Sequence, residues 1–239
     1  MIEQLKDYQL NTFDTEYVDE QKWPVIKRCI DRDFPDGQFS FLDIGGGNGL
    51  FADRILTNYP QSHGTMLDNS ALLINKNKPH DRKRVIVNSV ENIGTGNNEK
   101  YDLIFLNWLL HHLVDNTYRL TRQNIDGILL TIRSLLADRG RVSIFENMYN
   151  GLIFDRAPGW LVYQLTSQKL IAPIVAKAGA NTAGVGVCFL SEKQWHSCIQ
   201  GNGFEILDYY RDDVWEIPWT WNLFLHISKI YCGHFWLRI

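Results

Sequence analysis

Short apolar runs alternate with amphipathic segments along the first two thirds of the 239-residue chain. Apolar residues at helical spacing predict helices over 50–58 and 122–137. Five short apolar runs predict strands, at 39–44, 64–67, 85–87, 101–106 and 141–145. Because helices alternate with strands that are nearly all apolar, we expect an α/β fold with a parallel sheet and helices on both faces.

The alternation stops after residue 147, where the segment 148–188 is apolar, aromatic and rich in glycine near its end. A helix is predicted over 170–178, broken near its start by Pro173. The position of the segment suits a substrate cap over the strand ends. The alternative is a helical extension that fills its own core or forms a dimer face.

The last part of the chain returns to regular patterns. Ser191 is a plausible N-cap for a helix over 192–200, and a strand follows at 204–210. Residues 222–239 predict closing strands, arranged as a hairpin broken at Gly233.

A glycine-rich turn separates the first predicted strand from the first helix of the core. Asp43 ends the strand, and the turn holds Gly45, Gly46, Gly47 and Gly49. Glycines let the backbone bend sharply and let a ligand lie against bare backbone. Since free N–H groups at a helix N-terminus favour negative charge, the turn suits a nucleotide-like cofactor carrying a carboxylate or phosphate.

Asp68 follows the second predicted strand, 23 residues after Gly45. An acid at about this distance accepts hydrogen bonds from a ribose hydroxyl pair in nucleotide-binding sheets; an ordinary loop aspartate is the alternative. Residues 47–52 also fit the dinucleotide pattern G-x-G-x-x-A. However, Asp43 would repel a pyrophosphate and attract an ammonium or sulfonium group, so we disfavour NAD and FAD.

Composition and charge exclude several classes. The net charge is −3, so no bulk basic field indicates a nucleic acid partner. The four cysteines are widely spaced and match no zinc pattern, and we expect no metal. The N-terminus lacks a signal-peptide core, and no apolar run is long enough to cross a bilayer. We therefore expect a cytoplasmic protein without a membrane partner.

Motifs in a fixed order resemble those of class I S-adenosylmethionine-dependent methyltransferases. The stretch LDIGGGNG at 42–49 resembles their first motif, and Asp68 matches their ribose-binding acid. The other matching stretches are NSVENI at 88–93, YDLIFLNWLLHHL at 101–113, FLSEKQW at 189–195 and GFEIL at 203–207. The resemblance covers about residues 39–150 and 188–210.

This resemblance implies a doubly wound, seven-stranded, mostly parallel sheet with a final antiparallel strand, and S-adenosylmethionine as the cofactor. The methionyl part would lie over the glycine turn and beside Asn107, and the ribose at Asp68 and its neighbour Asn69. Backbone amides near Ser89 and Val90 would meet the adenine. Ser89 stands where many members carry an aspartate, and its hydroxyl can also accept a bond from the adenine amine.

Candidate catalytic residues lie at the ends of the fourth and fifth strands. His111 and His112 are about 100° apart on a helical turn, so we expect one to face the pocket and one to face away. We prefer His112 as the base, because the resembled family keeps it more often; a structural histidine is the alternative for either. Glu146 is placed to hold a hydroxyl, an amine or a metal, unless it is a plain surface acid.

We therefore expect one domain over 1–239. A helical lead-in at 1–37, which is either a lid or packed on the sheet, precedes the cofactor-binding core at 39–147, the cap at 148–188 and the closing elements at 189–239. The expected activity is methylation of O or N on a small, partly aromatic or apolar metabolite, in a chain that pairs as a homodimer through the cap or N-terminal helices. The alternatives are a methyltransferase of RNA or protein, and a non-catalytic cofactor-binding scaffold.

Overall fold

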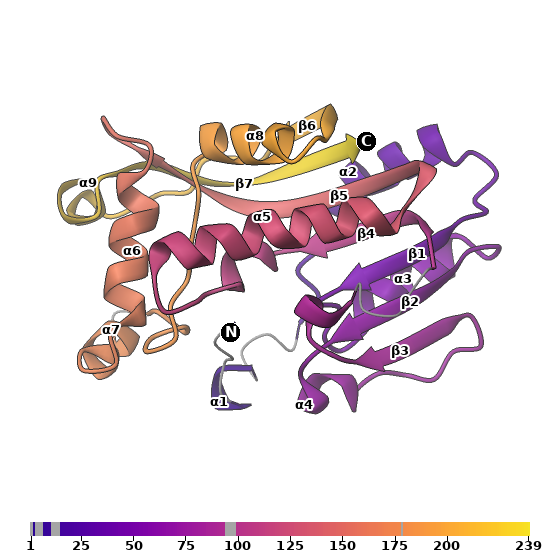
Figure 1. The fold of residues 1–239 in the computed structure, drawn as a ribbon, viewed down its shortest axis with the longest axis horizontal. Coiled ribbons are helices and arrows are strands. Elements are labelled where there is room, and N and C mark those ends of the chain that lie inside the picture. The colour runs from indigo at the N-terminus through magenta and orange to yellow at the C-terminus, as the bar shows by residue number, and fades with distance from the viewer. Residues whose placement is uncertain (1, 3–6, 11–14, 94–98, 178) are drawn as a thin grey trace.

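The computed structural model describes residues 2, 7–10, 15–93, 99–177 and 179–239. In this part of the chain, seven strands form one sheet with the order β3-β2-β1-β4-β5-β7-β6 (Figure 1). The strands are β1 (Ser40–Ile44), β2 (His63–Asp68), β3 (Lys83–Val87), β4 (Tyr101–Asn107), β5 (Leu136–Gly151), β6 (Glu205–Arg211) and β7 (Ile227–Arg238). β7 is antiparallel to both of its neighbours, β5 and β6, whereas β1 to β5 pair in parallel. The predicted doubly wound, mostly parallel sheet is confirmed.

Helices cover both faces of the sheet. The α-helices are α1 (Asp7–Leu10), α2 (Trp23–Asp33), α3 (Leu50–Asn58), α4 (Ala71–Ile74), α5 (Tyr118–Leu135), α6 (Ala157–Ser167), α7 (Ala172–Lys177), α8 (Glu192–Gly201) and α9 (Trp219–Phe224). Two short 3-10 helices, η2 (Val90–Asn92) and η3 (Leu110–His112), follow β3 and β4. Among the described residues, no helix combines the length and the apolar character that a membrane span requires.

Alternating side chains of the strands build two hydrophobic cores. Leu42 and Ile44 of β1 face the core shared with α5 and α8, where Trp195 is fully buried. Phe41 of the same strand faces the core shared with α2 and α3, which contains Ile30. This alternation is the two-residue period of a strand, and it decides which face of the sheet each side chain lies on.

The end of the chain differs from the predicted hairpin. β7 runs without a break through Gly233, which pairs with Glu146 of β5 and Arg211 of β6. A Cβ atom at Gly233 would lie 2.6 Å from Met148 Cε and 3.0 Å from Tyr209 Oη. The prediction of a hairpin broken at Gly233 is therefore wrong, because this glycine makes room for neighbouring side chains within a central strand.

Three further elements have other bounds than expected. α5 ends at Leu135, and β5 continues from the predicted strand to Gly151, where it pairs with Ile227. α7 is shorter than the helix predicted over 170–178, whose last residue lies outside the described residues. The segment between β5 and α8 forms α6 and α7, which stand at the end of the molecule to which the parallel strands point (Figure 1).

Candidate active site

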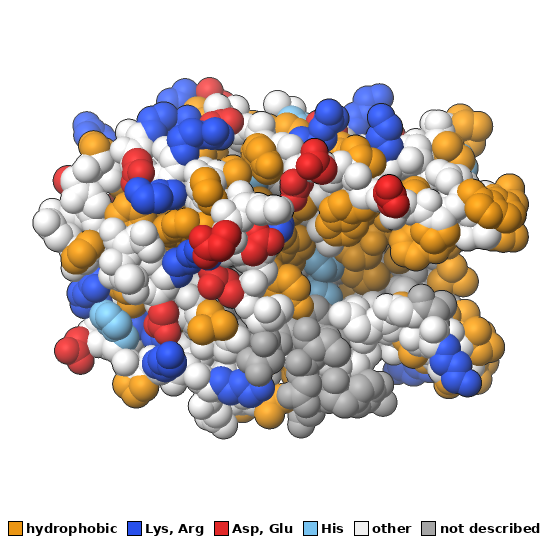
Figure 2. Space-filling view, turned by 180° about the vertical axis from the view of Figure 1, so that it is seen from behind, with side chains coloured by type: hydrophobic (Ala, Val, Ile, Leu, Met, Phe, Trp, Pro, Cys, Tyr) orange, Lys and Arg blue, Asp and Glu red, His pale blue; other side chains and the backbone are white. Residues whose placement is uncertain are grey.

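A cavity of about 970 Å³ opens at the carboxyl ends of the parallel strands. This volume is near the upper end of the range of about 300–1,000 Å³ for ligand pockets. Its walls come from the glycine turn, the chain before α2, the cap helices and the segment that contains α9. Figure 2 shows the hollow, with a histidine at its floor and apolar side chains along one side. The cavity is therefore wide enough for a cofactor and a second small molecule.

The glycine turn presents bare backbone to this cavity. Gly45, Gly47 and Gly49 have φ values of 75°, 54° and 78°, which L side chains rarely adopt. A Cβ at Gly46 would lie 2.4 Å from Met66 Cγ and 2.5 Å from Asp43 Oδ2. The N–H groups of Gly45 and Gly46 donate to Leu67 O at 2.7 and 3.3 Å, so the turn is tied to the end of β2.

Asp68 holds two loops together at the floor of the cavity. Its Oδ2 accepts from the N–H of Gly47 at 2.9 Å, and its Oδ1 accepts from the N–H of Ser70 at 2.7 Å. Burial raises the pKa of Asp68, and these backbone hydrogen bonds oppose the rise. Each carboxylate oxygen has a second lone pair, so Asp68 retains acceptor capacity for a ribose. Asn69 beside it also lines the cavity.

Two buried oxygens in the cavity wall lack a donor. Asp43 Oδ2 and Asn107 Oδ1 are both buried and have no hydrogen-bond donor among the described residues. Burial, with Asp68 adding to it and Lys83 opposing it, raises the pKa of Asp43 to about 7. An unsatisfied buried acceptor costs about 1–3 kcal/mol. A bound ammonium would donate to these oxygens, and a sulfonium would add a favourable positive charge, so these residues fit the methionyl end of S-adenosylmethionine.

The predicted adenine side lies along η2. Ser89 and Val90 both line the cavity, and Val90 is buried. The Ser89 N–H donates to Asn88 Oδ1 at 2.8 Å, and the Ser89 hydroxyl donates to Glu91 Oε2 at 3.2 Å. Since the hydroxyl donates to Glu91, its lone pairs remain available to accept from an amine.

His111 and Glu146 meet behind the cavity floor. Nδ1 of His111 lies 2.6 Å from Oε2 of Glu146, which is fully buried. The other oxygen, Oε1, accepts from the N–H of Leu110 at 2.8 Å and from that of His111 at 3.4 Å. Glu146 is therefore not a surface acid: it fixes both η3 and the ring of His111.

His111 and His112 both line the cavity, so the expectation that one faces away is wrong. Their ring centroids lie 4.1 Å apart. Burial and the neighbouring His111 hold the pKa of His112 well below its usual value, so its imidazole is neutral. The contact of His111 Nδ1 with Glu146 Oε2, at 2.6 Å, sets the orientation of the His111 ring.

Of the predicted site residues, eleven line the cavity: Asp43, Gly45, Gly46, Gly47, Asp68, Asn69, Ser89, Val90, Asn107, His111 and His112. Gly49 stands just behind, as the N-cap of α3, and Glu146 lies beneath His111. The arrangement brings together side chains from four strand ends. Among the described residues, no group of three His, Cys, Asp or Glu side chains is placed to hold a metal ion.

Sequence reasoning gave no role to three aromatic residues in this wall. Trp108 has a φ of 52°, its indole stacks on Phe145 at 5.0 Å, and its Nε1–H donates to Asn147 Oδ1 at 2.9 Å. Tyr149 and Phe189 stack at 4.1 Å, and Phe189 lies 4.9 Å from the ring of His111. The signal for Phe189 was its place as the first residue of the FLSEKQW stretch that leads into the last helix. A tryptophan with a positive φ leaves no signal in the sequence.

Comparisons with known proteins show what this chain is similar to. Residues 42–142 match a family model described as a methyltransferase domain. Tabersonine 16-O-methyltransferase of Catharanthus roseus is 34% identical over 169 residues, which are 71% of this chain and 41% of that protein. The chain thus spans less than half the length of this curated relative.

Two solved structures share the fold over most of their length. N-methyltransferase NodS from Bradyrhizobium japonicum WM9, in complex with S-adenosyl-L-homocysteine, gives a TM-score of 0.60 at 12% identity, over 97% of this chain and 95% of that chain. The [4+2]-cyclase SpnF gives a TM-score of 0.60 at 13% identity, over 92% of this chain and 81% of that chain. Together with the match of residues 42–142 to a methyltransferase domain, these structures show that the chain has a class I methyltransferase fold.

Proposed function

We propose that this protein transfers a methyl group from S-adenosylmethionine to a hydroxyl oxygen of a small, uncharged and largely apolar molecule. The observation that carries the proposal is the 2.6 Å contact between His111 Nδ1 and the buried carboxylate of Glu146. A histidine held in this way is suited to take a proton from a hydroxyl.

The cofactor would be held by the groups around the glycine turn. Asp68 would accept from the ribose, Asp43 and Asn107 would face the methionyl end, and the backbone near Ser89 and Val90 would meet the adenine. When bound, S-adenosylmethionine supplies an electrophilic methyl group on a sulfonium. The two unsatisfied oxygens of Asp43 and Asn107 support this assignment, because the ammonium of such a ligand could donate to them.

His111 is the general base in this proposal. Because Nδ1–H donates to Glu146, Nε2 carries the lone pair and is the ring nitrogen left to meet a ligand. Nε2 takes the proton of the acceptor hydroxyl, and the carboxylate of Glu146 stabilises the imidazolium that results. This geometry supports His111 over His112, the residue that the sequence favoured.

The far wall of the cavity indicates the chemistry of the acceptor. The charged side chains that line the cavity are Glu16, Asp19, Lys22, Asp43 and Asp68, and none of them belongs to the cap or to the segment with α9. The cap and the segment with α9 contribute apolar and neutral residues, including Val162, Ile174, Phe189, Trp215 and Trp221. Burying an unpaired charge against such a wall is costly, so the acceptor is uncharged where it meets the cap. Stacked aromatic rings beside His111 favour a planar ring on the acceptor.

The printed name of the plant relative supports oxygen as the acceptor atom, since it is an O-methyltransferase. The SpnF structure shows that a cyclase can have the same fold, so an activity other than methyl transfer is the alternative. The following experiment distinguishes the proposal from its two alternatives, which are methylation of RNA or protein and a non-catalytic scaffold.

The experiment uses methyl-labelled S-adenosylmethionine with the purified protein and either a cell metabolite extract or total RNA. We expect label in a small organic-soluble product and none in RNA, and we expect its loss in His111→Ala. Label found only in RNA or in protein would contradict the small-molecule proposal. Binding of the cofactor without transfer to any fraction would favour the scaffold.

A further inference from the structure

The segment that directly precedes α2 forms a strap across the cavity. We define the strap as Thr15–Lys22; five of its consecutive residues, 15–19, and also Lys22 line the cavity wall. Val18 is 2% exposed, so the strap is packed against the core at its middle. The sequence left open whether this region is a lid or a packed helix. In the structure it is an irregular segment that closes one side of the site.

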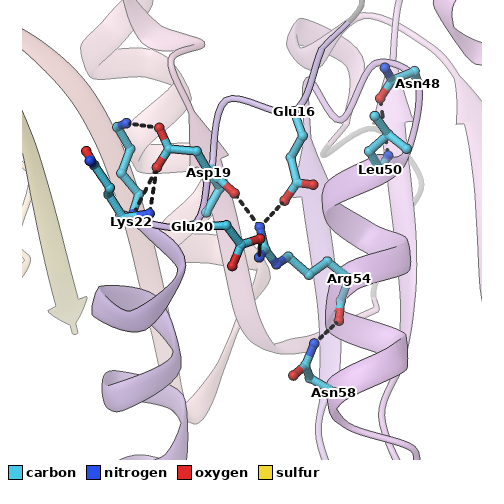
Figure 3. Close-up of polar contacts among 10 residues, drawn as sticks. Glu16, Asp19, Glu20, Lys22, Asn48, Leu50, Arg54 and Asn58 are labelled. Atoms are coloured by element: carbon cyan, nitrogen blue, oxygen red, sulfur yellow. Dashed lines mark hydrogen bonds and ion pairs between the residues drawn. The ribbon is translucent and has the colours of Figure 1, made fainter.

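One arginine of α3 holds the middle of the strap (Figure 3). Nη1 of Arg54 donates to Glu16 Oε1 at 2.9 Å and to the carbonyl oxygen of Val18 at 2.7 Å. Nη2 of Arg54 pairs with Glu20. The guanidinium also lies 5.0 Å from the ring of Trp23, the first residue of α2. A planar fork with several donors suits this set of acceptors in a way that a single ammonium does not.

The other anchors of the strap lie beside Trp108. Tyr17 packs against Trp108 with ring centroids 5.8 Å apart, and Lys22 Nζ lies 6.0 Å from the same indole. Asp19 accepts from the N–H groups of Gln21 and Lys22, both at 3.0 Å, and pairs with Lys22 Nζ at 2.6 Å. The strap therefore enters α2 through a fixed turn beside Trp108.

Before the strap, the chain is joined to the cap. Gln9 is 3% exposed, and its Nε2 donates to the carbonyl oxygen of Asn181 at 2.7 Å. A longer contact of 3.4 Å reaches the carbonyl oxygen of Ala183. The N-terminal part of the chain thus reaches from the cap to α3, and Arg54 is its anchor on the cofactor side.

We propose that Arg54 is a positioning residue for the cofactor: it holds the strap as the wall that retains S-adenosylmethionine over the glycine turn. The proposal rests on the cofactor named above. Because α3 begins at Gly49, the helix that carries Arg54 is the one whose N-terminus closes the glycine turn. Loss of the anchor would let the strap move away and give the bound cofactor a path to solvent.

The exposure of the partners ranks their contributions. The side chain of Glu20 is 88% exposed, whereas those of Arg54 and Glu16 are 16% and 25% exposed. An exposed ion pair contributes little because water and salt screen it. We therefore expect Glu20→Gln to change cofactor affinity less than Glu16→Gln, and Glu16→Gln less than Arg54→Met.

The test measures binding of S-adenosylhomocysteine to the full chain by calorimetry and its dissociation by stopped flow. For Arg54→Met we expect roughly tenfold weaker binding and faster release, which corresponds to about 1.4 kcal/mol. Arg54→Lys should restore part of the loss. Lys27→Met is the matched control, since it removes the 2.6 Å pair between Lys27 and Asp31 on α2, away from the cavity. Trypsin should cut after Lys22 faster in Arg54→Met than in the control.

Three outcomes would overturn the proposal or its basis. Unchanged binding and release in Arg54→Met contradict a role for Arg54. Weaker binding with unchanged cleavage after Lys22 also contradicts it, because Arg54 would then act through α3 and not through the strap. If Arg54→Met does not fold, as judged by thermal unfolding, Glu16→Gln gives the same readouts. Failure of the unmodified protein to bind S-adenosylhomocysteine contradicts the proposed function itself.

Discussion

His111, just beyond the end of β4, faces Glu146 of the neighbouring strand β5, with Nδ1 2.6 Å from Oε2. β4 and β5 pair in parallel up to Asn107 and Phe145, so the turn that follows β4 is brought beside Glu146, the next residue of β5. Glu146 is fully buried and also accepts from the backbone of η3. The sheet thus holds a carboxylate behind the histidine and leaves the other side of the ring to the cavity.

The first prediction concerns this pair. Glu146→Gln keeps an acceptor for the N–H of Leu110 but removes the charge that stabilises a protonated His111. We expect the methyl transfer rate to fall by roughly 10²–10⁴, as in the loss of general base catalysis, with little change in cofactor affinity. His111→Ala should fall by a similar amount. Rates on the acceptor found in the extract and calorimetry with S-adenosylhomocysteine check this.

His112→Ala is the matched comparison for His111→Ala, because the two residues are adjacent and both line the cavity. We expect the smaller loss in His112→Ala. The opposite order, with His112→Ala inactive and His111→Ala active, would identify His112 as the base, as the sequence favoured. It would contradict the proposed pair of His111 and Glu146.

A second prediction concerns Asp68. Asp68→Ala removes the acceptor for the ribose and also the bonds from the N–H groups of Gly47 and Ser70. We expect S-adenosylhomocysteine to bind roughly 10- to 100-fold more weakly, since hydrogen bonds to a charged group contribute about 1.5–3 kcal/mol. Asp81→Ala, at an exposed position outside the cavity, is the control. Equal affinity in Asp68→Ala and the control would remove Asp68 from the cofactor site.

A third prediction links stability to pH through Asp43. The pKa of this buried carboxyl rises from 3.8 to about 7, so between these values the folded state binds more protons than the unfolded state. Stability of the free protein should therefore fall as the pH rises from about 4 to about 7, by a few kcal/mol at most. Asp43→Asn should lack this fall.

The cofactor should act in the opposite direction on Asp43. An ammonium or sulfonium beside the carboxylate favours its charged form, so cofactor affinity should increase as the pH rises through about 7. Urea unfolding and calorimetry across the pH range check both statements. Free protein whose stability is flat between pH 4 and pH 7, or identical to that of Asp43→Asn, would show that this carboxyl does not carry the effect.

A fourth prediction concerns the aromatic ring that packs beside His111. Phe189 stacks on Tyr149 at 4.1 Å and packs against His111, so Phe189→Ala removes an aromatic surface beside the proposed base. We expect KM for the acceptor to rise roughly tenfold, while binding of S-adenosylhomocysteine stays the same. Phe189→Tyr should keep the stacking and most of the affinity. A rise in the dissociation constant for S-adenosylhomocysteine instead would place Phe189 on the cofactor side.

The sheet, the glycine turn and the position of Asp68 were predictable because their signals in the sequence are local. Apolar runs mark the buried strands, and the glycines around Gly46 mark the turn. Asp68 stands where the second strand ends. Even there, the pattern misjudged Gly233, since a glycine in a strand signals either a break or close packing, and only the neighbours Met148 and Tyr209 decide which.

The residues around His111 were predictable from the sequence, but their arrangement was not. The sequence showed two adjacent histidines and a distant glutamate, but the partner of Glu146 depends on how β4 and β5 align. The contact with Glu146 orients the ring of His111, and the positive φ of Trp108 depends on its contacts with Phe145 and Asn147. Arg54 and its strap partner Glu16 are 38 positions apart in the sequence, so no local pattern reveals their contact. Pairing of two copies through the cap or N-terminal helices, and a cytoplasmic location, stay predictions.

The most direct test of the central claim is the identity of the atom that receives the methyl group. The protein is incubated with S-adenosylmethionine carrying a carbon-13 methyl group and a metabolite extract, and the product is examined by NMR. We predict a methoxy carbon on a small, uncharged molecule, formed by the unmodified protein and lost in Glu146→Gln. A labelled N-methyl or C-methyl product, or full activity in Glu146→Gln, would contradict the account.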